Sequence, residues 1–120
     1  MKEDNIIQAK SYGFGLRILK LYLHLKEKKV DNGICSQLLR SGTSIGANVE
    51  EAIGGSSRKD FINKLQIAYR EARETKYWLR LLKDSEIIEK ELAHSFIKDC
   101  DEIIKLLTAI LNTSKSSKNS

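Results

Sequence analysis

The sequence predicts an all-α protein, an antiparallel up-down-up-down four-helix bundle, from three observations. The chain of 120 residues contains no proline, so no residue inside it forces a helix to stop. Apolar residues recur at helical spacing along four stretches. The connections between these stretches are short, which places consecutive helices side by side and antiparallel. The length suits a single domain, which we expect to span residues 1–112.

The first predicted helix, residues 5–28, has two apolar stripes. One consists of Phe14, Ile18, Leu21 and Leu25, and the other of Tyr12, Leu16, Leu19 and Leu23. A helix turns by about 100° per residue, so the stripes lie on nearly opposite sides. An isolated bundle buries only one of them, so the second is expected to contact another molecule, most simply another copy of the chain. The spacing does not assign either stripe to the outside.

The second predicted helix, residues 34–53, follows a turn at residues 30–33. Its expected buried face is Cys35, Leu39, Gly42, Gly46, Val49 and Ile53. Glycine inside a helix costs about 1 kcal/mol relative to alanine. We therefore expect another backbone to pack very closely at Gly42 and Gly46.

The third predicted helix begins after Gly54 and Gly55, with Ser57 and Asp60 as its capping pair. Its expected seam is Phe61, Leu65, Ala68, Ala72, Thr75, Leu79 and Leu82. The fourth begins after residues 84–85, ends near residue 112 and is expected to bury Leu92, Phe96, Cys100, Ile103, Leu107 and Ile110. Residues 113–120 contain no apolar residue, which predicts a disordered, mildly basic tail.

Positive charge is concentrated in the third predicted helix. Residues 58–83 hold eight Lys or Arg against three acids, a net charge of +5, which equals that of the whole chain. Residues 85–111 hold three Lys against six acids. A basic stripe of this kind can follow a phosphate backbone. The candidate nucleic-acid contacts are Lys59, Arg70, Arg73, Lys76, Arg80 and Lys83.

Two other uses of this basic helix remain open. It can pair with the acidic fourth helix, within the bundle or between copies. Part of its charge can also be neutralised locally, as by Arg70 and Glu74 one turn apart. Tyr69, Tyr77 and Trp78 can offer stacking faces to unpaired bases, although for Trp78 we favour a place in the core or an interface.

Polar residues line one side of the second predicted helix. Arg40, Ser44, Asn48 and Glu51 fall within about 80° of its circumference. They predict a structural hydrogen-bonded network that reaches Glu74 on the third helix; the alternative is a solvated face.

No catalytic residue, metal or cofactor is expected. Glu91 and His94 have the spacing of one half of a two-metal bundle site. The only other histidine, His24, has leucine at the corresponding position, so the second half is missing. The two cysteines, Cys35 and Cys100, are expected to be reduced and packed as small apolar side chains.

We expect a cytoplasmic protein without a membrane segment. The first residues lack the basic-then-apolar pattern of a signal peptide. Arg17 and Lys20 interrupt the only long apolar stretch.

Three segments of the sequence are recognisable: residues 40–51 (RSGTSIGANVEE), 57–61 (SRKDF) and 72–74 (ARE). Within a likeness over about residues 9–111, they resemble the 23S rRNA intervening-sequence protein family, whose members are also called four-helix-bundle proteins. Ala52 departs from the glycine of many relatives. The resemblance implies a small antiparallel bundle that assembles into homopentamers. It also implies a relation to accessory proteins of diversity-generating retroelements, which associate with a reverse transcriptase and with nucleic acid.

Together these features predict a non-enzymatic homo-oligomer, with a pentamer favoured by the resemblance. Its expected ligand is nucleic acid, DNA or RNA, with structured RNA favoured, bound through the basic third helix. The alternative is an oligomeric adaptor for another protein, for example a reverse transcriptase or another nucleic-acid enzyme.

Overall fold

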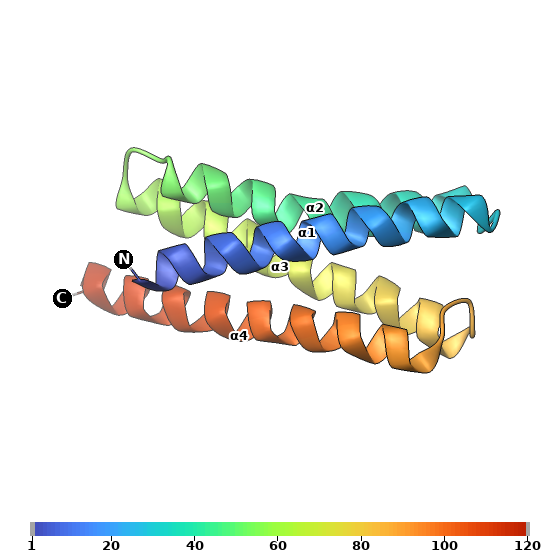
Figure 1. Ribbon diagram of the computed structural model, residues 1–120. Coiled ribbons are helices and arrows are strands. Elements are labelled where there is room, and N and C mark those ends of the chain that lie inside the picture. Colours follow the sequence, from blue (N-terminus) through green and yellow to red (C-terminus); the bar gives the residue numbers. More distant parts are fainter. Residues whose placement is uncertain (1, 120) are drawn as a thin grey trace.

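The computed structural model describes residues 2–119, and it describes the side chains of all of these except residues 3 and 117–119. It contains helices α1 (Lys2–Glu27), α2 (Asn32–Ile53), α3 (Arg58–Asp84) and α4 (Lys90–Asn119) (Figure 1). The predicted all-α bundle is confirmed. Consecutive helices run antiparallel, so both ends of the chain lie at the same end of a bundle 51 Å long (Figure 1).

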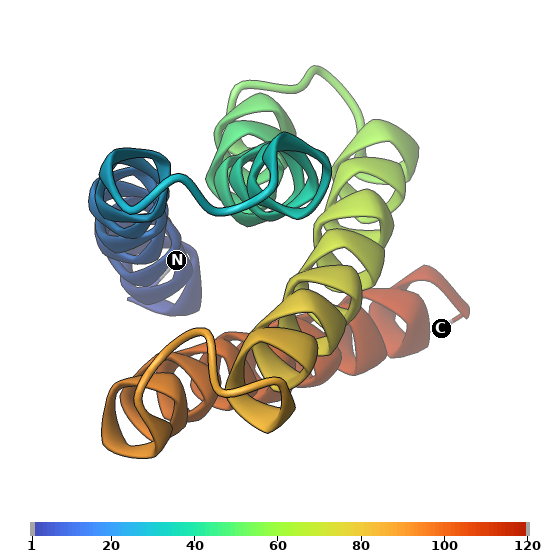
Figure 2. The same ribbon diagram turned by 90° about the vertical axis from the view of Figure 1, so that its right-hand side faces the viewer.

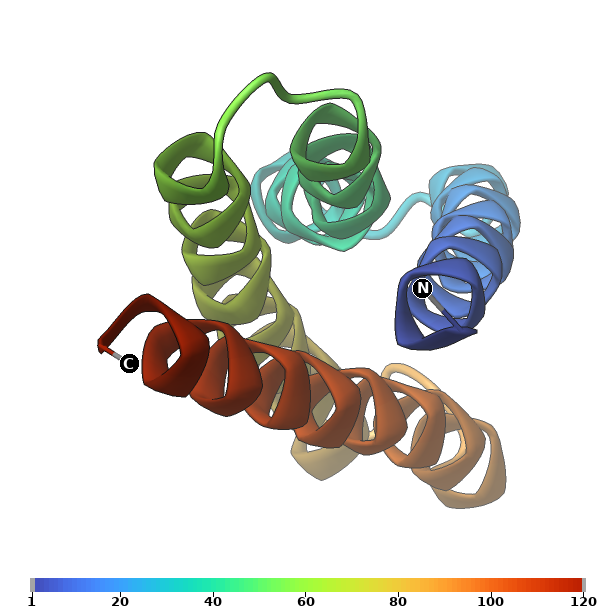
Figure 3. The same ribbon diagram turned by 90° about the vertical axis from the view of Figure 1, so that its left-hand side faces the viewer.

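Each helix packs against two neighbours. Seen along the bundle, α2 and α4 separate α1 from α3, which lie on opposite sides (Figures 2 and 3). In this view, α3 and α4 cross one another, whereas α1 and α2 lie side by side along the opposite edge (Figure 2). The outer surface of α3 is therefore far from that of α1.

One apolar stripe of α1 is buried and the other is exposed. Phe14, Ile18, Leu21 and Leu25 are all buried in the core. The other stripe faces outward: 70% of the Tyr12 surface, 45% of Leu16, 41% of Leu19 and 55% of Leu23 remain exposed. The outward stripe, which the sequence did not identify, is therefore the one beginning at Tyr12.

The buried seam of α2 differs from the expected one. Leu38, Ile45 and Ala52 are buried, whereas Leu39 is half-buried and Ile53 is exposed. The reason is that α2 packs against both α1 and α3, so its core-facing arc is turned toward α3. The seam expected from the sequence runs through Gly42 and Gly46, and these two glycines lie on the side of α2 that faces α1.

α1 and α2 approach closely at those glycines. A Cβ atom added to Gly42 would lie 2.7 Å from Cγ2 of Ile18, and one added to Gly46 would lie 3.2 Å from the backbone oxygen of Ser11. The close neighbour is thus a backbone at Gly46 and a buried side chain at Gly42.

α3 begins as expected and buries most of its expected seam. The Ser57 hydroxyl accepts a hydrogen bond from the backbone N–H of Asp60 at 3.0 Å. The seam is buried from Leu65 to Leu82, but Phe61 is only half-buried because Ile62 occupies the core at that level.

α4 differs from the prediction at both ends. A turn occupies residues 85–89, where the backbone N–H groups of Ile87 and Ile88 both donate to the Leu82 oxygen. The helix therefore begins at Lys90, and its first core residue is Ala93; Leu92, expected in the core, is one position off the seam and 39% exposed.

At its other end, α4 passes the expected boundary at residue 112 and continues to Asn119. Ser114, in the segment expected to be disordered, is only 8% exposed. The Arg58 guanidinium at the start of α3 donates to the Ser114 backbone oxygen at 3.4 Å. This contact ties the helical extension to the bundle.

Both cysteines are buried free thiols. Burial raises the pKa of the Cys100 thiol to about 12, and its Sγ lies 3.1 Å from the Ala72 backbone oxygen. A thiol with so high a pKa stays protonated, and only the thiolate is reactive, so Cys100 is an inert core residue. Across residues 2–119, no helix has the length and apolar character needed to cross a membrane.

Candidate nucleic-acid interface

The six candidate basic residues lie on α3, and the structure divides them into two groups. Lys59, Arg70, Arg73 and Arg80 are exposed, whereas Lys76 and Lys83 are partly covered. Lys76 Nζ lies 2.8 Å from Oδ1 of Asp101 on α4, so part of the stripe does pair with the acidic helix. Lys83 Nζ lies 3.7 Å from Oδ1 of its neighbour Asp84. Ion pairs as exposed as these contribute little to stability, so both ammonium groups can still turn toward a ligand.

No acidic residue in the described part of the chain pairs with Arg70, Arg73 or Arg80. The Arg73 guanidinium lies over the Tyr69 ring at 5.8 Å and donates to the Tyr69 hydroxyl at 3.3 Å. Among the described residues, Arg70 and Arg80 form no ion pair. The local pair considered for Arg70 is not formed, because Glu74 is engaged by Arg40. The outer surface of α3 therefore carries three guanidinium groups with their full charge.

The polar residues of α2 meet two glutamates of α3. Arg40 pairs with Glu71 at 2.9 Å and also with Glu74. The Ser44 hydroxyl donates to the same Glu71 oxygen at 2.9 Å, and the Trp78 indole N–H donates to Glu74 at 3.0 Å. These contacts bridge the two helices.

Two expected members of this network lie elsewhere, and one member was not expected. Glu51 pairs instead with Lys64 at 3.3 Å. Asn48 donates to the Ser44 backbone oxygen of its own helix at 2.8 Å. The unexpected member is Glu71, which is three residues before Glu74 and so faces the same way. The three-residue spacing of Glu71 and Glu74 is the sequence signal that predicts a role for Glu71 in this network.

The described residues form a charged surface on α3 but no cluster of metal ligands. Within the described part of the chain, no group of three or more His, Cys, Asp and Glu residues is placed to hold a metal ion. His94 is exposed on α4, beside the exposed Glu91.

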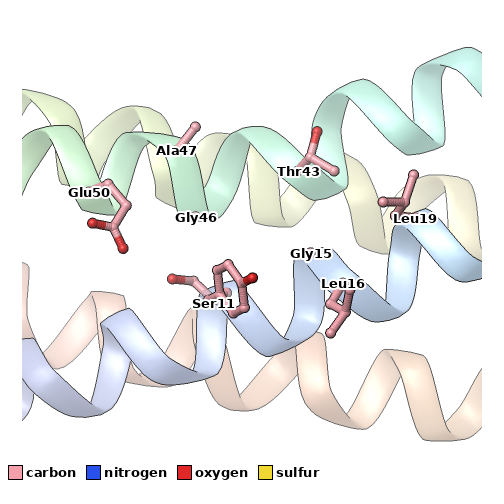
Figure 4. A pocket seen from close by; sticks show the side chains of 9 residues that line it. Ser11, Gly15, Leu16, Leu19, Thr43, Gly46, Ala47 and Glu50 are labelled. Carbon is pink, nitrogen blue, oxygen red and sulfur yellow. The ribbon is translucent and has the colours of Figure 1, made fainter.

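A second surface lies on the other side of the molecule, between α1 and α2. A shallow apolar groove of about 350 Å³ runs along the outward stripe of α1 (Figure 4). It is lined by Ser11, Tyr12, Gly15, Leu16, Leu19, Thr43, Gly46, Ala47 and Glu50. Gly15 and Gly46 allow α1 and α2 to approach closely along this groove.

Known proteins resemble this chain along most of its length. Residues 3–109 match the family described as 23S rRNA-intervening sequence protein. A crystal structure of a protein of unknown function, from the S23 ribosomal protein family and from Bacteroides thetaiotaomicron, is 50% identical to this chain with a TM-score of 0.88. The match covers 92% of this chain and 98% of that one. No curated protein matches the sequence. The chain belongs to the 23S rRNA-intervening sequence protein family.

Proposed function

We propose that this protein is a non-enzymatic, cytoplasmic homo-oligomer that binds nucleic acid, with structured RNA as the favoured ligand. The observation that carries the proposal is the set of exposed guanidinium groups of Arg70, Arg73 and Arg80 on one helix, none of them paired with an acid among the described residues. Guanidinium groups bind phosphate through paired hydrogen bonds. The family's name, which refers to ribosomal RNA, also favours RNA.

Self-association is the second part of the proposal. Four large apolar side chains of α1 remain exposed along a continuous stripe that borders an apolar groove. A contiguous apolar surface of this kind is typical of a protein interface. Assembly, as a pentamer if the chain follows the resemblance, would present several α3 surfaces to one RNA, so that weak contacts act together.

The test is charge reversal on α3. We expect R73E/R80E to weaken binding to a folded RNA by at least tenfold. The same change is expected to reduce the slope of log affinity against log salt by about one for each phosphate that the variant no longer binds. Fluorescence anisotropy across a salt series measures both quantities.

The matched control reverses two exposed lysines of α4, Lys98 and Lys105. K98E/K105E changes the net charge by the same amount but leaves α3 intact. Equal weakening by the two double variants would mean that binding depends on net charge alone and would overturn the assignment to α3.

One observation favours an adaptor as the alternative function: the apolar groove could receive a helix of another protein, such as a reverse transcriptase or another nucleic-acid enzyme. An adaptor would show little RNA affinity at physiological salt and a stoichiometric protein partner. L16D would remove that partner, whereas R73E/R80E would not.

A further inference from the structure

Tyr77 is an exposed aromatic ring on the basic helix. Although it is large and mostly apolar, 52% of its surface remains in contact with solvent. A single exposed tyrosine is ordinary on a protein surface. The neighbours of Tyr77 make this one informative.

Tyr77 lies among the arginines that form no ion pair with any residue that the structure describes. With a turn of about 100° per residue, Arg70, Arg73, Tyr77 and Arg80 fall within roughly 80° of the circumference of α3. Arg73 is one turn before Tyr77, and Arg80 is one turn after it. The surface therefore alternates guanidinium, phenol ring and guanidinium along the helix.

The Tyr77 ring is supported from below by a chain of contacts. It meets the Trp78 ring in an edge-to-face arrangement, with 5.2 Å between centroids and 67° between planes. The Trp78 indole N–H is fixed by Glu74, which Arg40 of α2 holds in turn. The α2–α3 polar network thus anchors one side of the aromatic pair. A ring that is already positioned loses little conformational entropy when a ligand binds.

A second copy of this chain offers this surface little free negative charge from α4. Of the four acidic residues in the described part of that helix, three are paired within the chain and Glu91 is not. The pairs are Lys10 with Glu102 at 3.2 Å, Arg17 with Asp99 at 2.5 Å and Lys76 with Asp101 at 2.8 Å. A ligand with several negative charges and planar apolar groups fits better.

Nucleic acid has this combination only where its bases are unpaired. In a duplex the base faces are stacked inside, and only phosphates and groove edges are accessible. In single strands and loops the bases can stack on aromatic side chains while the backbone contacts arginine.

We propose that Tyr77 stacks on an unpaired base of the bound nucleic acid while Arg73 and Arg80 contact the flanking phosphates. This inference rests on the proposed function and specifies the ligand as single-stranded segments, including loops of a folded RNA. Trp78, Glu74 and Arg40 are positioning residues that hold the ring.

The single tryptophan of the chain provides a direct probe. Trp78 touches Tyr77, so a base stacked there is expected to change its emission. The intact protein is titrated with a single-stranded RNA and with the same strand paired to its complement. We expect the emission to change with the single strand and to stay constant with the duplex.

The variants separate stacking from charge. Y77L is expected to lose about tenfold in single-strand affinity and to keep its duplex affinity, whereas Y77F retains both. I87A, which removes an exposed apolar side chain from the turn before α4, is the control and is expected to bind as the wild type does. E74A, measured well below its melting temperature, is expected to shift the Trp78 emission and to lower single-strand affinity while duplex affinity is kept.

The other outcomes have distinct meanings. Equal affinity of Y77L and wild type for the single strand would overturn the stacking role and leave the proposed function standing. Absence of binding to any RNA would overturn both. A drop in assembled mass in Y77L would show that another protein copy covers the ring, and this too would overturn the inference.

Discussion

Gly42 shows how one missing methyl group sets the distance between two helices. An added Cβ would lie 2.7 and 2.8 Å from two γ carbons of Ile18, a fully buried, β-branched side chain that cannot easily rotate away. Gly13, on the exposed side of α1, has no atom within 4 Å of the same hypothetical Cβ. A side chain at Gly42 would therefore collide with the core, whereas one at Gly13 would meet open space.

These two glycines allow a paired stability measurement. Alanine favours a helix over glycine by about 1 kcal/mol, but overpacking a core costs roughly 1–3 kcal/mol. We expect G42A to lower the free energy of unfolding by up to about 2 kcal/mol and G13A to raise it by roughly 0.5–1 kcal/mol. Urea denaturation followed by circular dichroism measures both. Stabilisation by G42A would contradict the close packing of α1 on α2.

At the scale of elements, α2 and α3 are joined by a polar contact outside the apolar core. Arg40 forms ion pairs with Glu71 and Glu74. The Glu71 side chain is 20% exposed, and it is bound by both Arg40 and Ser44. Removing the arginine would leave two neighbouring carboxylates facing each other. The cost comes from this repulsion and from the missing hydrogen bonds, moderated by the solvent that reaches Arg40.

We therefore expect R40M to lower the free energy of unfolding by about 1 kcal/mol. E51Q is its control, because Glu51 forms a single exposed ion pair with Lys64; that change is expected to stay within about 0.5 kcal/mol of wild type. Thermal and urea unfolding measure both variants. Equal effects would mean that the α2–α3 network stabilises no more than an ordinary surface pair.

Helices and caps could be predicted because their signals are local. Ser57 with Asp60 is enough to identify the start of α3. The seam of α2 was misplaced because Gly42 and Gly46 mark the edge facing α1, and no local signal says that α3 covers the adjacent arc. Leu92 was misplaced for a similar reason, since the length of the turn before α4 sets the phase of that helix.

The candidate site was only partly accessible to sequence reasoning. Charge counting located the basic surface on α3, because formal charges can be summed without coordinates. It did not show that Lys76 pairs with Asp101 while Arg80 carries no ion pair among the described residues, because that difference depends on which residues of α4 lie opposite. The family assignment, in contrast, followed from the sequence segments themselves.

At the scale of the whole molecule, the outward stripe of α1 predicts the oligomeric state. We expect L16D/L23D to reduce the mass measured by light scattering to that of a single 13.6 kDa chain, because the charges would have to be buried between copies. I87D is the control: Ile87 is 46% exposed, but it lies in the turn before α4. A wild-type protein that is already monomeric would refute self-association through α1.

The separation of α1 from α3 by the other two helices has an evolutionary consequence. Substitutions that tune one outer surface have no direct contact with the other, since α1 and α3 do not pack together. If α3 binds the ligand and α1 mediates assembly, as proposed, relatives could diverge in ligand preference while keeping the same quaternary arrangement, or change their stoichiometry without altering what they recognise. The bundle thus provides two surfaces that natural selection, or a protein engineer, can modify one at a time.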